Sequence, residues 1–77
     1  MSLRKPWKPL SKETLRGVPD RYGVYELGDD EGNSLGVDAG PLRDELKEAL
    51  AYGDGSKVRW RVATSREHAE SMLDEHR

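Results

Sequence analysis

The chain contains no cysteine, phenylalanine or isoleucine. Without cysteine it can form no disulfide, no cysteine-ligated zinc site and no thiol nucleophile, so nothing in the composition points to an oxidising compartment. Leucine and valine supply only 14 of the 77 residues, which predicts one small domain with a thin hydrophobic core. The net charge of −2 argues against disorder, because disordered chains usually carry a large net charge. We therefore expect a folded domain that depends on packing alone.

Long apolar runs are also missing, and no stretch approaches the ~20 apolar residues of a membrane helix. Met1 to Leu10 hold three cations and two prolines, where a signal peptide needs an apolar stretch. We therefore expect a soluble, cytoplasmic protein. Residues 1–16 are expected to form a basic N-terminal arm with a short helix capped by Ser11, and residues 17–77 a single domain.

Three stretches alternate with the period of two that is typical of strands. Two of them flank an acidic, glycine-containing run over residues 28–33, and we predict that they form a β-hairpin: Tyr22 to Leu27 and Ser34 to Ala39. The third runs from Lys57 to Thr64 and is the clearest strand in the chain.

Two other stretches repeat with helical spacing. Pro41 suits the first position of a helix, because its missing N–H is not needed there, and an apolar stripe follows it: Leu42, Leu46, Ala49 and Leu50. Ser65 is a good N-cap for a second helix, whose apolar residues include Ala69, Met72 and Leu73. The sequence therefore predicts a small α/β domain of the α+β type: a three-stranded, mainly antiparallel sheet with flanking helices, in the order β-β-α-β-α.

Charge is segregated along this order of elements. The net charges are +4 over residues 1–21, −7 over 22–54, +4 over 55–66 and −3 over 67–77. Two basic segments therefore flank an acidic middle. If the arm folds back beside the third strand, a local basic patch forms on a chain that is acidic overall.

The tripeptide Gly23-Val24-Tyr25 and the run from Leu35 to Arg43 stand in an order of elements that resembles the GIY-YIG nuclease domain. That family has a proline-containing lead, which Val18-Pro19 matches, and then a Gly-(Ile/Val)-Tyr strand. A hairpin, a Tyr-(Ile/Val)-Gly strand and a helix bearing an arginine follow. The resemblance covers about Gly17 to Glu75, and the order of the elements carries it more than any one motif.

The resemblance also implies roles for particular residues. In the family, two tyrosines and the arginine surround one phosphate, and a glutamate on a later helix holds a divalent cation. Phosphodiester hydrolysis needs an activated water, a metal and a cation that stabilises charge on the phosphoryl oxygens. By this resemblance Tyr25 corresponds to the first tyrosine, and Glu70 is a candidate for the metal-binding glutamate beside Asp74 and Glu75.

The remaining family positions carry other residues. Gly36 takes the place of the second tyrosine, and Asp38 takes that of the glycine in the second motif. Glu45 takes the place of the helix arginine, with Arg43 two positions away. An acid there repels the phosphate that an arginine attracts. The resemblance therefore implies the fold and argues against the family's reaction.

A row of basic residues forms a candidate nucleic-acid-binding surface, which we place on the sheet face that carries Tyr25. The candidates are Lys57, Arg59, Arg61, Arg66 and Arg43. Alternatively, these charges solvate an open sheet face or pair across strands with Glu26. The same choice between a nucleic-acid contact and a solvated surface applies to the cations of the arm, Arg4, Lys5 and Lys8.

The aromatic residues leave similar alternatives. Trp60 alternates with valines and is predicted at the centre of the core, with a stacking platform for a base as the alternative. Trp7 either docks on the domain and holds the arm or contacts a partner. The three tyrosines could line one pocket: Tyr22, Tyr25 and Tyr52. The alternative is that Tyr22 and Tyr25 lie on opposite faces of one strand.

Metal ligands with suitable spacing are not found. His68 and His76 lie eight residues apart, whereas two histidines that chelate a metal from one helix are usually four apart. The acidic run over residues 29–33 lacks the spacing of a calcium loop and is interpreted as a hairpin turn.

Three hypotheses follow. The first is a catalytically degenerate GIY-YIG-like domain that acts as a binding or accessory module, with DNA or RNA as the candidate ligand. The second is a small protein-interaction domain on the same scaffold. The third, ranked last, is a metal-dependent endonuclease with a rearranged site. No cofactor is expected outside the third hypothesis, which needs a divalent cation such as Mg²⁺. The chain is expected to be a monomer or a weak homodimer without a membrane partner.

Overall fold

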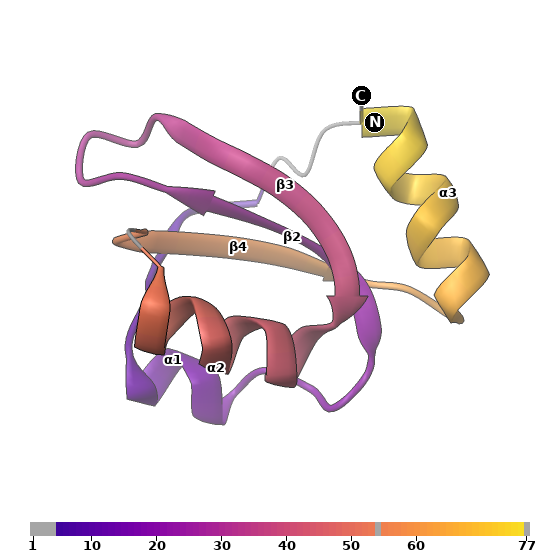
Figure 1. Ribbon diagram of the computed structural model, residues 1–77, viewed down its shortest axis with the longest axis horizontal. Helices are drawn as coiled ribbons and strands as arrows, with labels where there is room; N and C mark the ends of the chain where they lie inside the picture. Colours follow the sequence, from indigo (N-terminus) through magenta and orange to yellow (C-terminus); the bar gives the residue numbers. More distant parts are fainter. Residues whose placement is uncertain (1–4, 54, 77) are drawn as a thin grey trace.

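Figure 1 shows the computed structural model, which describes residues 5–53 and 55–76, with the side chain of His76 left out of account. One antiparallel sheet with the strand order β1-β4-β2-β3 forms the centre of the domain. The elements in chain order are β1 (Lys8–Pro9), α1 (Lys12–Arg16), β2 (Tyr22–Gly28), β3 (Ser34–Pro41), α2 (Leu42–Tyr52), β4 (Lys57–Val62) and α3 (Arg66–His76). The predicted α+β class and the predicted order of the longer elements are confirmed.

The prediction of three strands is wrong by one, because the N-terminal arm adds the edge strand β1. Lys8 of β1 pairs with Val58, and Pro9 pairs with Lys57. Beyond it the Leu10 N–H donates to the Ser56 carbonyl at 2.9 Å. A proline-containing strand is tolerated at a sheet edge, and two residues are too few to show a period of two.

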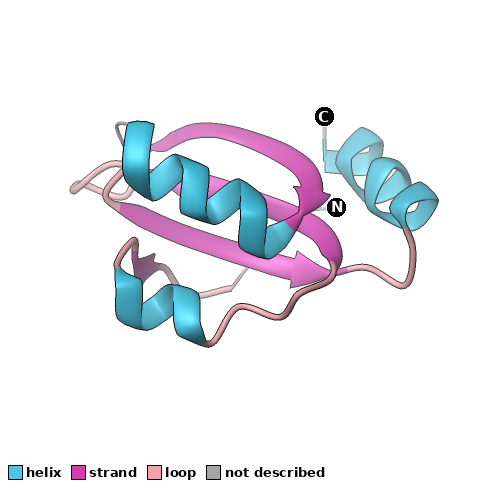
Figure 2. Ribbon diagram, turned by 60° about the horizontal axis from the view of Figure 1, so that its bottom comes forward, coloured by secondary structure: helices cyan, strands magenta, loops and turns pink. Residues whose placement is uncertain are grey.

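The helices α1 and α2 lie on the same side of the sheet (Figure 2). Between them and the strands is a cluster of buried side chains: Leu15, Val18, Tyr25, Leu42, Leu46 and Val58. Trp60 is only half-buried and packs at the border of this cluster, so its predicted place at the centre of the core is wrong. Leu15 belongs to α1, so the core extends into residues 1–16 and does not stop at residue 17.

The helix α3 covers part of the opposite sheet face. Its buried side chains Ala69, Met72 and Leu73 pack with Val24 and Ala63. The N-cap predicted at Ser65 is confirmed, because the His68 N–H donates to the Ser65 hydroxyl oxygen at 3.1 Å. Within the described residues, no helix is long and apolar enough to cross a membrane.

The rest of this second face is covered by the arm rather than by a helix. The Arg59 guanidinium stacks on the Trp7 ring, 4.2 Å from its centroid, and pairs with Glu26 at 2.5 Å. The same guanidinium donates to the Lys5 carbonyl at 3.2 Å. A methyl group added at Gly28 would lie 2.7 Å from the Trp7 indole, so the ring lies directly against β2. We call Lys5, Trp7, Glu26 and Arg59 the Trp7 cluster. Trp7 therefore docks on the domain and holds the arm.

Candidate functional site

Two of the positions implied by the nuclease resemblance, Tyr25 and Glu45, meet in one hollow. Tyr25 extends from β2 and Glu45 from the first turn of α2, and the hollow they line measures about 280 Å³. Its remaining lining residues are Glu48, Ala49, Tyr52 and Gly53. Tyr52 itself is 86% exposed. We call this hollow the tyrosine pocket, and none of the described residues that line it is a cation.

The electrostatics of the tyrosine pocket oppose the binding of a phosphate. Burial raises the pKa of Tyr25 to about 12, and the carboxylates of Glu45, Asp38 and Glu48 add to the shift. Burial also raises the pKa of Glu45, and Asp38 and Glu48 act in the same direction. A tyrosine that holds its proton and faces carboxylates is a poor general base and is badly placed to receive an anion.

The candidate metal ligand Glu70 lies elsewhere. It is exposed on α3, which packs on the Val24 side of the sheet, and it pairs with Arg66 at 3.6 Å. Side chains alternate between the faces of a strand, so Tyr25 points to the opposite side. Asp74 and Glu75 are likewise exposed on α3. In the described part of the chain, no three histidine or acidic side chains are grouped so that they could hold a metal ion.

The positions of the second motif lie at the edge of the sheet. Gly36 on β3 is exposed and has a φ of +154°, a conformation that favours glycine. The Asp38 carboxylate accepts a hydrogen bond from the Ala39 N–H at 2.8 Å. Neither residue brings a hydroxyl or a cation to Tyr25.

The basic residues predicted from the sequence do not form one surface. Arg59 and Arg61 lie on the sheet face opposite Tyr25, so the expectation that the three share a face is wrong. Arg59 is held in the Trp7 cluster, as the alternative of a cross-strand pair with Glu26 predicted. Lys57 is half-buried at the start of β4, and Arg66 pairs with Glu70. Arg43 lies apart from all of these, on α2.

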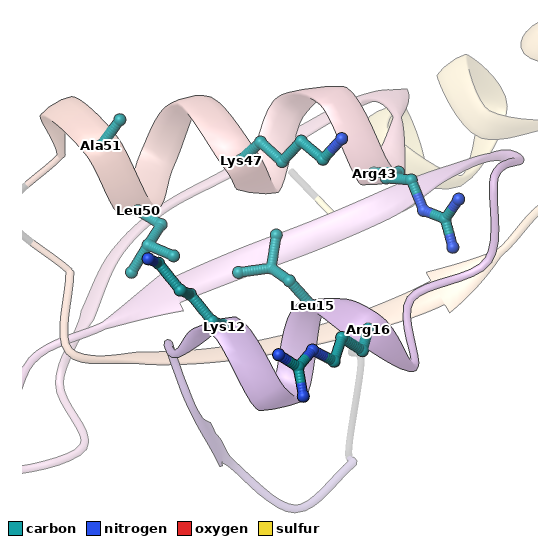
Figure 3. A pocket seen from close by; sticks show the side chains of 7 residues that line it. All are labelled: Lys12, Leu15, Arg16, Arg43, Lys47, Leu50 and Ala51. Carbon is teal, nitrogen blue, oxygen red and sulfur yellow. The ribbon is translucent and has the colours of Figure 1, made fainter.

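Arg43 instead belongs to a groove between α1 and α2 (Figure 3). The groove measures about 660 Å³; Leu15 and Leu50 form its floor, and the exposed residue Ala51 also lines it. Four cations lie along its rim, two from each helix: Lys12, Arg16, Arg43 and Lys47. We call these seven residues the basic groove. The sequence contained a signal for it, because the cations form two pairs with the i, i+4 spacing that places side chains on one side of a helix.

A smaller hollow of about 110 Å³ lies at the β1 edge of the sheet. Lys5, Lys8 and Trp60 line it together with Pro6 and Arg59. The Lys8 ammonium is 5.9 Å from the centroid of the Trp60 ring, within the range of a cation–π contact. Cations therefore lie beside an aromatic ring here, although the hollow is much smaller than the basic groove.

The predicted hairpin turn is confirmed, and the contacts of Asp29 show what holds it. Asp29 accepts hydrogen bonds from the backbone N–H groups of Glu31 at 2.9 Å and Asn33 at 2.8 Å, and the bond from Asn33 lowers its pKa most. The carboxylate thus stabilises the turn. His68 Nδ1 accepts from the Thr64 N–H at 2.9 Å, which leaves this nitrogen occupied.

The fold and these surfaces define a small α+β domain with one antiparallel sheet, a helix pair on one face and a single helix on the other. The chain belongs to the family described as "Domain of unknown function (DUF7508)", which matches residues 1–77.

The chain is also similar to tRNA pseudouridine synthase D of Geobacter sp. (strain M21), with 44% identity over 55 residues. The match covers 65% of this chain and 14% of that relative, so the two share only a small part of the longer protein. No solved structure matches the chain.

Proposed function

We propose that this chain is a non-catalytic binding module on a GIY-YIG-like scaffold and that it binds an acidic protein partner. The observation that carries the proposal is the basic groove, in which four cations surround an apolar floor on a chain of net charge −2. A local field of this kind attracts anionic partners even when the whole molecule is acidic.

The absence of catalysis in this proposal is supported by the positions of the candidate residues. Tyr25 and Glu45 share a pocket of acidic character, while Glu70 projects from the opposite side of the sheet. A phosphodiester in the tyrosine pocket would meet carboxylates where the nuclease family has an arginine. Magnesium has no role in this proposal.

A cleavage assay tests the loss of catalysis. The purified chain is incubated with double-stranded DNA, single-stranded DNA or RNA in the presence of Mg²⁺, and the products are separated on a gel. We expect no cleavage above the level of a protein-free control. Magnesium-dependent cleavage that the Tyr25→Phe variant abolishes would overturn the proposal and restore the nuclease hypothesis.

A second candidate function is nucleic-acid binding, and the similarity to a protein named for its action on tRNA favours it. The hollow at the β1 edge supplies the required chemistry, because single-stranded nucleic acids bind where cations lie beside an aromatic ring. Fluorescence anisotropy with a labelled oligoribonucleotide at low and high salt tests this candidate. Salt-dependent binding that Lys8→Ala weakens and Arg43→Ala leaves unchanged would place the nucleic acid at that edge.

The proposal also specifies where the module acts and its oligomeric state. The module acts in the cytoplasm as a monomer or a weak homodimer, without a membrane partner. Sedimentation velocity at increasing protein concentration tests the oligomeric state directly. A stable dimer at micromolar concentration would contradict it.

A further inference from the structure

We infer that the basic groove binds a short amphipathic helix of a partner protein, with aliphatic side chains on the groove floor and Asp or Glu side chains against the four cations. This inference rests on the proposed binding function and specifies its ligand. Three properties of the groove support it: the shape of its walls, the charge of its rim and the composition of its floor.

The walls are two helices, α1 and α2, joined through the buried side chains of Leu15 and Leu46. Eleven residues of α2 span about 16 Å, which is the length of about three helical turns. A third helix that lies between two others can insert its side chains between theirs, which is how amphipathic helices bind in grooves. The groove volume of about 660 Å³ leaves room for a few aliphatic side chains.

The rim carries four positive charges that the rest of the described chain does not neutralise. Within residues 5–53 and 55–75, Lys12, Arg16, Arg43 and Lys47 form no ion pair, whereas Arg59 and Arg66 each have a carboxylate partner. Figure 3 shows these cationic side chains on both helices, where they line the same groove. Bringing like charges together is unfavourable, and an anionic ligand removes that cost.

The floor distinguishes a peptide from a nucleic acid. Leu15, Leu50 and Ala51 are aliphatic, and no aromatic side chain of the described residues lines the groove. Nucleic bases bind by stacking on aromatic rings, while leucine-like side chains gain from aliphatic contact. An acidic helix with an apolar stripe matches both the floor and the rim, whereas a polynucleotide matches only the rim.

The probe for the test is a fluorescein-labelled synthetic peptide of about 15 residues, long enough to form a helix in contact with protein. It carries leucines spaced i, i+4 and i+7 and glutamates on both flanks of that stripe. Three comparison ligands are a scrambled peptide of the same composition, the same peptide with glutamine for glutamate, and a labelled oligoribonucleotide. Anisotropy titrations measure each dissociation constant, and amide NMR shifts locate the binding site.

We expect the acidic amphipathic peptide to bind and to shift the amide resonances of Leu50 and Ala51. We expect the scrambled and glutamine peptides to bind at least about tenfold more weakly, since each loses one of the two matched features. Equal binding of the scrambled peptide would show that charge alone is recognised, and the inference would fail.

A pair of substitutions at one exposed position supplies the sharpest variant test. Ala51 is exposed and lines the groove, so a long side chain there does not disturb the core. Ala51→Glu places a negative charge against the acidic peptide and should weaken binding about tenfold. Ala51→Lys adds a side chain of similar length and opposite charge and should leave binding unchanged or stronger. Equal losses in both variants would contradict the charge match.

Adjacent positions on α2 supply a matched control. Arg43 lines the groove and Asp44 does not, although both lie in the first turns of the same helix. We expect Arg43→Ala to weaken peptide binding several-fold and Asp44→Ala to leave it unchanged, with thermal unfolding measured for both variants to confirm folding.

The outcomes separate this inference from the broader proposal. Binding of the oligoribonucleotide without the peptide would reject the peptide ligand and leave a non-catalytic binding module. Magnesium-dependent cleavage of the oligonucleotide would reject the module itself. Binding of the peptide with shifts confined to the β1 edge would reject the basic groove as its site.

Discussion

The two faces of the sheet are covered by different means. On the α2 face, side chains from α1, α2, β2 and β4 form one continuous apolar cluster. On the α3 face, an apolar cluster around Val24 occupies one part, and the Trp7 cluster with its Arg59–Glu26 ion pair occupies the other. The domain has few large apolar residues, and most of them lie on the α2 face. Part of the α3 face is covered instead by the Trp7 ring, which stacks on the guanidinium of the Arg59–Glu26 ion pair.

The buried side chains of this small core therefore differ in kind between the two faces of the sheet. The described residues of the α2 face include Leu42, Leu46 and Val58, all fully buried. On the α3 face, Glu26 is the buried charged side chain among the described residues; it is 4% exposed, and Arg59 neutralises its charge. Burying a carboxylate is costly without a partner, so the second face depends on the geometry of the ion pair as well as on apolar contact.

The largest expected effect is that of a cavity in the α2 face. Leu46→Ala removes a side chain with no exposed surface and should lower the free energy of unfolding by about 2–5 kcal/mol. Met72→Ala on the α3 face should cost less, because α3 packs on this face as a single helix and can shift to fill part of the cavity. Urea denaturation of both variants measures the difference. A larger loss for Met72→Ala would reverse the ranking of the two faces.

The next effect is that of an unmatched charge on the α3 face. Glu26→Ala leaves the Arg59 guanidinium without its carboxylate, and the expected loss is about 2 kcal/mol because the Arg59 side chain is still 23% exposed to water. Chemical denaturation measures this loss, and Glu26→Gln, which keeps a hydrogen-bond acceptor, should lose less. An undisturbed stability in Glu26→Ala would show that the Trp7 ring alone covers this part of the sheet.

A smaller effect concerns alkaline pH. The folded state holds the Tyr25 proton up to about pH 12, whereas the ordinary pKa of a tyrosine is 10.0. The unfolded chain therefore releases this proton first, and stability should fall as the pH rises from 10 towards 12. Tyr25→Phe should make that decline shallower, as urea midpoints at several pH values would show. A decline made equally shallow by Tyr22→Phe, which alters an exposed tyrosine, would contradict the assignment to Tyr25.

The smallest effect is that of one carboxylate in the tyrosine pocket. The raised pKa of Glu45 means that its charged form is disfavoured in the folded state, so this contribution to stability is present below its ordinary pKa of 4.5 and is lost as the pH rises through the folded value. Glu45→Gln should therefore raise stability at neutral pH by less than about 1 kcal/mol, with no gain at acid pH. Thermal unfolding at the two pH values measures this, with Lys47→Gln on the other side of α2 as the control. A gain that persists at acid pH would show that charge is not its cause.

The sequence predicted those parts of the fold that have a local pattern. The alternation of Val58, Trp60 and Val62 marked β4, and the spacing of Leu42 and Leu46 marked α2, because burial on one face imposes these periods. β1 has no pattern of its own. It exists because Trp7 and the backbone of residues 8–10 bind to strands that come much later in the chain.

The candidate site was less predictable because it depends on which segments meet. The pairing of Arg59 with Glu26 was one of two alternatives, and only the register of β2 against β4 decides between them. Lys12 and Arg43 line the same groove although the whole hairpin separates them in the sequence, and no period in the sequence encodes the meeting of α1 and α2. Tyr25 and Glu70 fall on opposite sides of the sheet because α3 crosses to the other face after β4.

Gly23, the first residue of the Gly-Val-Tyr tripeptide, has a purely steric reason to be glycine. A methyl group there would collide with the Arg61 carbonyl oxygen of β4 and lie 2.7 Å from Leu42 Cδ1 of α2. Close packing in the folded state is therefore sufficient to explain the glycine at position 23. In this architecture the glycine of Gly-Val-Tyr is explained by how closely β2 packs against β4 and α2.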